Sequence, residues 1–303
     1  HPYFQRLRRI KQLGLTHLVY PGALHTRFHH ALGSMHLMEQ ALDVLLNKEV
    51  EITEEEREAA LIAILLHDIG HGPFSHALER SLVKDAPDHE EISLAFMNHL
   101  NDEFNGKLSL AIEIFKGTYR KHFLSQLVSS QLDMDRLDYL SRDSYFTGVS
   151  EGIVGTDRII KMLNVVDNEL VIDEKGVYSI EKYLISRRLM YWQVYLHKAV
   201  LSAEFMLINI LRRAQHLMQK GMPLFCSPDL LPFLNQSMEF DNITQRAELL
   251  AHYASIDDSD ITVSVKVWAN HEDKILSFLC KSLAHRKLFK IKLQRDPIKD
   301  ETR

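Results

Sequence analysis

The chain has 303 residues, of which 46% are hydrophobic and 25% charged, a balance typical of a globular protein with one or two domains and a sizeable core. Its formal net charge of −5 gives no support to nucleic acid as a binding partner. The two cysteines, Cys226 and Cys280, are far apart and argue against a disulfide framework, and no apolar run reaches the roughly 18 residues of a membrane span. We therefore expect a cytoplasmic protein with no membrane contact.

Helical periodicity dominates the first part of the chain. Residues 27–46 predict one helix. Thr53 and Glu56 predict the capping box of a second helix, which continues through the apolar run 59–66. A helix that is apolar on all sides is normally the buried centre of a domain. We therefore expect its end to carry His67 and Asp68 into the interior, where Gly70, Gly72 and Pro73 stop the helix.

Three shorter helical segments are predicted next. Pro73 suits the first turn of a short helix carrying His76 and Glu79. Asp88 can cap a helix over residues 90–99, and residues 131–143 form a further helical stretch.

The second half of the chain is again mostly helical. Residues 165–172 predict a small β-hairpin, and Val177-Tyr178 a possible added strand. Residues 180–220 predict one long helix or a kinked pair, in which we expect Trp192 to pack into the core. A break at Gly221 separates a catalytic domain, residues 1–220, from a C-terminal α+β subdomain, residues 221–303, that ends in a strand at 287–293. The role of that subdomain is assembly or regulation.

Histidines and aspartates recur along the chain at His30, His67-Asp68 and Asp135. Imidazole and carboxylate are common ligands of metal centres that activate water. A buried His-Asp pair is costly unless it is paired or metal-bound. For Asp135, helix capping or an ion pair with Arg136 is the alternative role. His29 competes with His30 as a ligand. The pattern therefore predicts a metal site with some ligands still to be chosen.

Several segments in one order resemble the HD-domain metal-dependent phosphohydrolases, and among them the deoxynucleoside-triphosphate triphosphohydrolases. They are FQRLRRIKQLG (4–14), VYPGALHTRFHH (19–30), LLHDIGHGPFSHALE (65–79), DHE (88–90), LDMDRLDYLSRD (132–143) and YWQVYLHK (191–198). No motif covers the chain after residue 221. The resemblance implies a helical HD fold that hydrolyses a deoxynucleoside triphosphate (dNTP) to deoxynucleoside and inorganic triphosphate.

The resemblance also implies roles for individual residues. The implied ligands of one divalent transition metal (Fe, Mn or Zn) are His30, His67, Asp68 and Asp135. The implied catalytic group comprises His71, His76, Glu79 and His89, with His89 as the candidate general acid. Phosphate contacts fall on Arg27, Arg136 and Arg187, with Mg or Mn accompanying the phosphates. Sugar and base contacts fall on Gln12, Leu13, Tyr139, Asp143 and Tyr195.

Two other functions are compatible with the same residues. One is another HD phosphohydrolase activity, either a nucleotidase or a phosphodiesterase. The other is a nucleotide-sensing or nucleic-acid-binding regulator with slow turnover. By resemblance we also expect a homo-oligomer, either a dimer or a tetramer.

Overall fold

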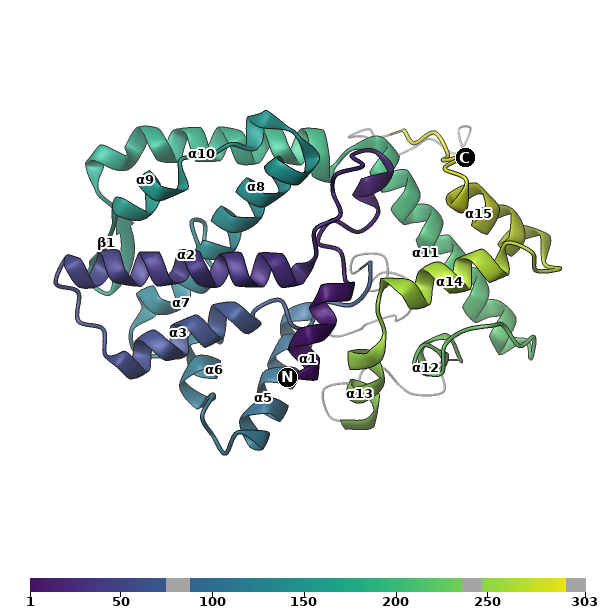
Figure 1. Cartoon of the computed structure of the whole chain (residues 1–303), viewed down its shortest axis with the longest axis horizontal. Coiled ribbons are helices and arrows are strands. Elements are labelled where there is room, and N and C mark those ends of the chain that lie inside the picture. Colours follow the sequence, from purple (N-terminus) through teal and green to yellow (C-terminus); the bar gives the residue numbers. More distant parts are fainter. Residues whose placement is uncertain (75–87, 236–246, 293–303) are drawn as a thin grey trace.

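The computed structural model describes residues 1–74, 88–235 and 247–292, which are mainly helical (Figure 1). This confirms the fold class expected from the sequence. Up to residue 161 the helices are α1 Pro2–Gln5, α2 Arg27–Asn47, α3 Glu54–Leu66, α5 His89–Glu103, α6 Ser109–Phe115, α7 His122–Val128, α8 Met134–Thr147 and α9 Thr156–Lys161. They are followed by α10 Val177–Met190, a π-helical turn Tyr191–Tyr195, α11 Lys198–Gln219, α12 Leu231–Asn235, α13 Ala247–Ser255, α14 Asp258–Trp268 and α15 Lys274–Ala284.

Helix α2 lies at the centre of the helices α1 to α9 and packs against both α3 and α8 (Figure 1). The capping box predicted for α3 is present: the Thr53 hydroxyl accepts from the Glu56 backbone at 3.2 Å, and the Glu56 carboxylate accepts from the Thr53 backbone at 2.8 Å. The helix ends at Leu66, so His67 and Asp68 follow it directly, and each is only 8% exposed. The prediction that this helix delivers both residues into the interior is confirmed.

The predicted hairpin is present as strands β1 Leu163–Val166 and β2 Glu169–Ile172, which pair antiparallel. Asp167 and Asn168 both adopt positive φ, at 50° and 67°, as a type I′ turn that joins two strands with two residues requires. The added strand at Val177-Tyr178 was a wrong prediction, because these residues begin α10. The strand propensity of two residues gives way there to the helical packing of the whole segment through Met190.

The kinked pair is the alternative that the structure supports for residues 180–220. The segments 174–195 and 198–219 meet at a bend of 54°. Trp192 lies in the π-helical turn and is 79% exposed, so the expectation that it packs into the core was wrong. Within the described ranges no single helix is long and apolar enough to cross a membrane. These two segments pass that test only when they are taken together.

The C-terminal segments are helical wherever they are described. Residues 287–292 form no regular secondary structure, so the strand predicted to begin at residue 287 is absent from that stretch. Most of the buried apolar residues of α11 to α15 belong to the same hydrophobic cluster as most of those of α2 and α3. The boundary near residue 221 stays a prediction. The short helix predicted to carry His76 and Glu79 lies outside the described residues.

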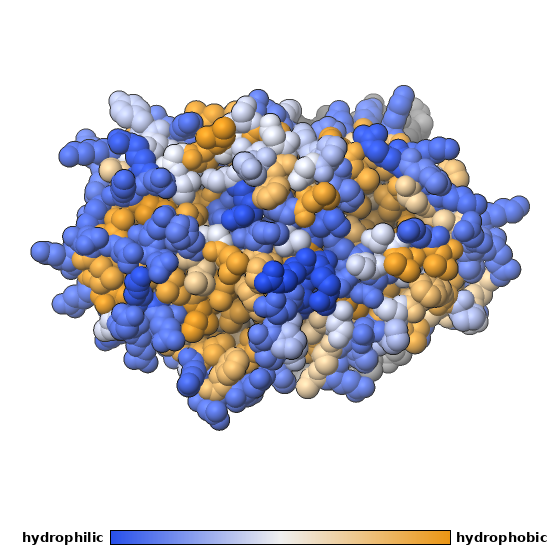
Figure 2. All heavy atoms as spheres, in the orientation of Figure 1, coloured by the Kyte–Doolittle hydropathy of each residue, from blue (hydrophilic) through white to orange (hydrophobic). Residues whose placement is uncertain are grey.

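The segment after α1 contacts both α2 and the start of α14. Arg8 and Arg9 in this segment are exposed. Figure 2 shows a strongly hydrophilic patch in the middle of the visible face. The Arg8 guanidinium lies 3.6 Å from the centre of the Phe28 ring on α2, whereas Arg9 pairs with Asp257 at the start of α14. These cations therefore anchor the N-terminal segment on both sides.

Candidate metal centre

Three elements bring the predicted ligands together. His30 comes from the first turn of α2, His67 and Asp68 follow α3, and Asp135 lies in the first turn of α8. The side chain of Asp133 caps α8 by accepting from the Arg136 backbone at 2.6 Å, so the helix begins at Met134, directly before Asp135. The close packing of α2 against α3 and α8 makes these positions neighbours in space.

The donor atoms stand at spacings that suit one metal ion. His30 Nε2 lies 3.3 Å from His67 Nε2 and 3.0 Å from Asp135 Oδ1, and His67 Nε2 lies 3.5 Å from that oxygen. The Asp68 carboxylate is 3.4 Å from His67 Nε2 and 3.8 Å from His30 Nε2. Two donors that are each ~2.1 Å from one ion stand about 3.0–3.4 Å apart. His30, His67 and Asp135 therefore form a group that fits one divalent metal ion, and Asp68 lies at the edge of this group with Oδ1 toward His67 and Oδ2 toward His30.

Each imidazole is oriented by a hydrogen bond at its other nitrogen. His30 Nδ1 lies 2.7 Å from Asp138 Oδ2, and Arg142 holds that carboxylate with two bonds of 2.8 Å. His67 Nδ1 lies 2.6 Å from the Ile64 carbonyl oxygen. These bonds direct both Nε2 atoms at the same point. Hydrogen bonds of this kind orient the imidazole ligands of many metal sites. His29, the rival of His30, is instead exposed and caps α2.

Asp138 is a residue of the site for which the sequence pattern predicted no separate role. A Cβ atom at Gly33 would lie 2.0 Å from its carboxylate oxygen, so only glycine lets α8 approach α2 this closely. The glycine inside an otherwise regular helix, three residues after His30, was the available signal.

The carboxylates and imidazoles of the cluster stabilise one another's charged forms. Burial alone would lower the pKa of His30, but its hydrogen bonds with Asp135 and Asp138 raise that pKa well above its usual value. Burial opposes ionisation of Asp135, yet His30 and His67 hold the pKa of this carboxyl well below its ordinary range. The carboxylates thus attract positive charge to the two imidazoles, and a divalent cation that displaces their protons would be stabilised by the same carboxylates.

One further histidine contacts Asp68, and a second stacks on the first. His71 Nε2 is 3.3 Å from Asp68 Oδ1, and its ring stacks on that of His89, with ring centres 4.0 Å apart and an angle of 14°. Burial and the charge of Arg27 hold the pKa of His71 well below its usual value. A Cβ atom at Gly70 would lie 2.2 Å from the His89 carbonyl, so this glycine allows the contact between loop and α5. The other predicted catalytic residues, His76 and Glu79, lie outside the described residues.

Of the three predicted phosphate-binding arginines, Arg27 contacts the cluster directly, whereas Arg136 and Arg187 bond to residues outside it. Arg27 is 5% exposed and donates to Asp68 Oδ2 at 2.6 Å. Arg136 donates to the Ser130 carbonyl at 2.7 Å and to Asp133 at 3.1 Å. Arg187 reaches Gln131 at 3.5 Å. The Arg187 guanidinium also lies 5.8 Å from the centre of the Tyr191 ring. Burial and the neighbouring Tyr191 and Asp135 raise the pKa of Tyr139, and Arg136 and Arg187 only partly offset this.

The predicted sugar and base residues are only partly gathered. The Tyr195 hydroxyl donates to Asp143 Oδ2 at 2.8 Å, and the rings of Tyr139 and Tyr195 meet edge to face with centres 6.1 Å apart. The Tyr139 ring centre is 6.5 Å from that of His30. Gln12 has a buried side-chain oxygen, whereas Leu13 packs half-buried against the core. The structure thus places three of the five residues together, the rings of Tyr139 and Tyr195 and the carboxylate of Asp143, with the Tyr139 ring beside His30.

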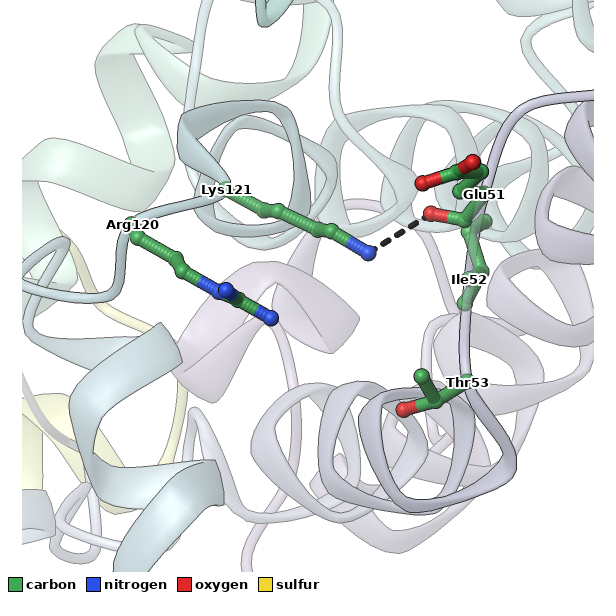
Figure 3. Close-up of a pocket in the computed structure, with 5 residues that line it drawn as sticks. All are labelled: Glu51, Ile52, Thr53, Arg120 and Lys121. Atoms are coloured by element: carbon green, nitrogen blue, oxygen red, sulfur yellow. Dashed lines mark hydrogen bonds between the residues drawn. The ribbon is translucent and has the colours of Figure 1, made fainter.

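A surface cavity of about 560 Å³ lies elsewhere, between the start of α3 and the segment before α7 (Figure 3). Glu51, Ile52, Thr53, Arg120 and Lys121 line it. Lys121 points across the cavity and donates to the Glu51 carbonyl at 2.7 Å, as the dashed line in Figure 3 marks. Its ammonium group also pairs with Glu56 at 2.7 Å, so its charge is already compensated.

The helical fold and the His/Asp cluster together define a metal-dependent hydrolase. Models of the HD domain and of an HD-associated region match residues 27–143 and 154–223. A phosphohydrolase from Bacteroides thetaiotaomicron, known from its crystal structure, is 53% identical with a TM-score of 0.97, covering 100% of this chain and 75% of that one. The chain belongs to the HD-domain phosphohydrolases.

Two relatives extend this comparison. The uncharacterized Bacillus subtilis protein YwfO is 38% identical over 290 residues, which are 94% of this chain and 65% of that protein. The Dictyostelium discoideum homolog of the deoxynucleoside triphosphate triphosphohydrolase SAMHD1 is 33% identical over 263 residues, which are 81% of this chain and 50% of that protein. The chain thus spans between half and two thirds of the length of these two relatives.

Proposed function

We propose that this protein hydrolyses deoxynucleoside triphosphates to a deoxynucleoside and inorganic triphosphate. Water attacks the α-phosphorus, the bond from that phosphorus to the 5′ oxygen breaks, and the 5′ oxygen leaves with a proton. The similarity to a family member named as a deoxynucleoside triphosphate triphosphohydrolase supports this substrate. A divalent metal held by the cluster around His30 and Asp135 would supply Lewis-acid activation of water and phosphate.

The observation that carries the proposal is the set of cations around the cluster. A triphosphate brings about four negative charges, and guanidinium groups bind such oxygens as planar forks. Arg27 donates to Asp68 at 2.6 Å, Arg136 directly follows Asp135 in α8, and Arg187 lies over the Tyr191 ring at 5.8 Å. A monophosphate or a diester would not need three arginines at one site, so this set favours a triphosphate.

His89 is the proposed proton donor to the leaving oxygen. It stacks on His71, whose ring contacts Asp68, so it lies one ring away from the ligands. His71, with its lowered pKa, would act as a neutral neighbour that orients the phosphate or His89. His76 and Glu79 keep their proposed catalytic roles from the resemblance alone.

A product assay tests the proposal. Purified protein is incubated with each of the four dNTPs and with GTP, in the presence of Mn²⁺ or Mg²⁺. Nucleoside, monophosphate and diphosphate are then separated by ion-exchange chromatography. We expect deoxynucleoside and triphosphate from a dNTP, with GTP spared. Release of monophosphate or diphosphate, or no product from any dNTP, would contradict the proposal. The last outcome, combined with saturable dNTP binding, would indicate a nucleotide sensor.

A further inference from the structure

A short antiparallel bridge places polar side chains in a row beside the metal centre. Lys11 and Thr26 form this bridge, in which the Gln12 backbone donates to the His25 carbonyl at 3.0 Å and the Arg27 backbone donates to Ile10 at 2.9 Å. Opposed residues in such a pair share a face, and faces alternate along each strand. Gln12, His25 and Arg27 therefore lie on one face. Because Arg27 contacts Asp68, this face is turned toward the metal centre.

His25 is the member of this row that has no assigned role. Its side chain is completely buried, and its ring stacks on Phe146 with centres 4.5 Å apart at 17°. Its Nε2 atom lies 2.7 Å from Asp143 Oδ1, while the other carboxylate oxygen accepts from Tyr195 at 2.8 Å. A hydrogen-bonded chain thus runs from the segment before α2 through α8 to the π-helical turn. Both oxygens of the buried carboxylate are fixed by it.

Two atoms in this row have unfulfilled hydrogen-bonding capacity. His25 Nδ1 and Gln12 Oε1 are buried and have no hydrogen-bond partner among the described residues. A buried polar atom without a partner costs roughly 1–3 kcal/mol, so such atoms are uncommon unless a ligand completes them. Gln12 and His25 are opposite one another next to the bridge, and His25 contacts Asp143. The two atoms therefore indicate a polar binding position near Asp143 and Tyr195, distinct from the proposed phosphate contact at Arg27.

We propose that His25 is a positioning residue of the pentose-recognition part of the site. It fixes Asp143, and through Asp143 it fixes Tyr195. The Tyr195 hydroxyl gives its only proton to Asp143, so the ring is held in one orientation and its oxygen can only accept. A ring held in this way can discriminate between sugars by which hydroxyl groups they carry. This inference rests on the proposed dNTP hydrolysis.

Replacing His25 by three residues separates its hydrogen bond from its packing. His25→Gln retains an N–H donor at nearly the Nε2 position and loses the ring. His25→Phe retains the stacking on Phe146 and loses the donor. His25→Asn is polar but too short to reach Asp143, and it replaces the Phe variant if that variant does not fold. His36→Phe, at an exposed histidine of α2, is the matched control. Metal content and circular dichroism are measured for every variant.

We expect His25→Phe and His25→Asn to raise KM for the dNTP roughly tenfold or more, with metal content unchanged and a smaller change in kcat. Discrimination against the ribonucleotide should fall in parallel. His25→Gln and His36→Phe should stay within about threefold of wild type. The proposal is overturned if Phe supports a wild-type KM, or if Gln is as impaired as Phe and Asn. Failure of the proposed function would be visible separately, as a wild-type protein that releases no deoxynucleoside, and the inference would fall with it.

Discussion

Asp138 connects the metal centre to the rest of α8 through one carboxylate. One of its oxygens holds His30 Nδ1, and both oxygens are fixed by Arg142. Because a metal-bound imidazole needs its other nitrogen anchored, this carboxylate sets both the ring orientation and the basicity of the ligand.

Asp138→Asn is expected to weaken metal binding about 10–100-fold, since the amide keeps the shape of the side chain but loses its charge. Competition titration against a chelator, with Mn²⁺ or Zn²⁺, measures this affinity. Asp157→Asn, at an exposed aspartate in the first turn of α9, is the control. An affinity equal to wild type in the Asp138 variant would show that His30 needs no such anchor.

Arg187 and Arg188 form a matched pair of adjacent cations. Arg187 is half-buried and faces Gln131 and the Tyr191 ring, whereas Arg188 is exposed. Arg187→Ala should lower kcat/KM for a dNTP roughly tenfold or more, because a charge-assisted contact to phosphate is lost. Arg188→Ala should leave it unchanged. Equal turnover in both variants would argue for a substrate smaller than a triphosphate.

At the residue scale, the sequence could reveal only those side chains whose neighbours carry a local signal. His67 and Asp68 follow an all-apolar helix, so their burial could be predicted. The roles of Asp138 and His25 depend on contacts with His30 and Asp143, which are 108 and 118 residues away along the chain. Nothing in the local pattern distinguishes them from an ordinary helix aspartate and loop histidine.

At the scale of the element, the start of α3 is the clearest case of a local rule that the fold reinforces. Glu56 completes the capping box and also accepts from the Tyr119 hydroxyl at 2.7 Å and from Lys121 at 2.7 Å. Burial alone would raise the pKa of Glu56, but Lys121, Tyr119 and the Thr53 backbone lower it below its ordinary value.

This shift makes the contribution of Glu56 to stability depend on pH. A carboxyl whose pKa is lower in the folded state stabilises above its unfolded pKa of ~4.3, and the contribution is lost as pH falls through the folded pKa. Glu56→Gln should therefore lower the free energy of unfolding by about 1–2 kcal/mol near pH 7, with the difference shrinking below about pH 4. Urea unfolding across this pH range measures it, with Glu55→Gln as an exposed control. A difference independent of pH would contradict the assignment.

The elements that were predicted wrongly share one physical cause. Val177 and Tyr178, and the residues from 287 onward, have strand-forming side chains, but strand propensity needs a pairing partner to take effect. Among the described residues, β1 and β2 pair only with each other, and Val177 continues directly into α10. Capping residues such as Thr53 and Asp88 were reliable because their hydrogen bonds are local.

At the scale of the whole molecule, the C-terminal helices support the loop that follows the metal ligands. The Tyr253 hydroxyl on α13 donates to the Gly70 carbonyl at 2.9 Å. Buried Arg6 donates to the Ile69 carbonyl at 2.9 Å and to the Tyr253 carbonyl at 3.3 Å. Burial lowers the pKa of Arg6 to about 10, so it stays charged at neutral pH. The position of Asp68 and His71 therefore depends on residues from both ends of the chain.

Tyr253→Phe removes one hydrogen bond from this support while keeping the ring. We expect a loss of about 1 kcal/mol in unfolding free energy and faster amide hydrogen exchange in residues 69–71. Tyr178→Phe, at a tyrosine that is 84% exposed, should change neither. Exchange rates that are unchanged in the Tyr253 variant would show that the loop is held without the C-terminal helices.

We propose that a metal centre built on His30, His67, Asp68 and Asp135 directs water to the α-phosphorus of a dNTP. Hydrolysis in ¹⁸O-labelled water, followed by mass spectrometry of both products, tests it most directly. The account predicts one ¹⁸O atom in the inorganic triphosphate and none in the deoxynucleoside, with turnover lost after treatment with a chelator. Label in the deoxynucleoside, or in a released monophosphate, would place the attack elsewhere and contradict the account.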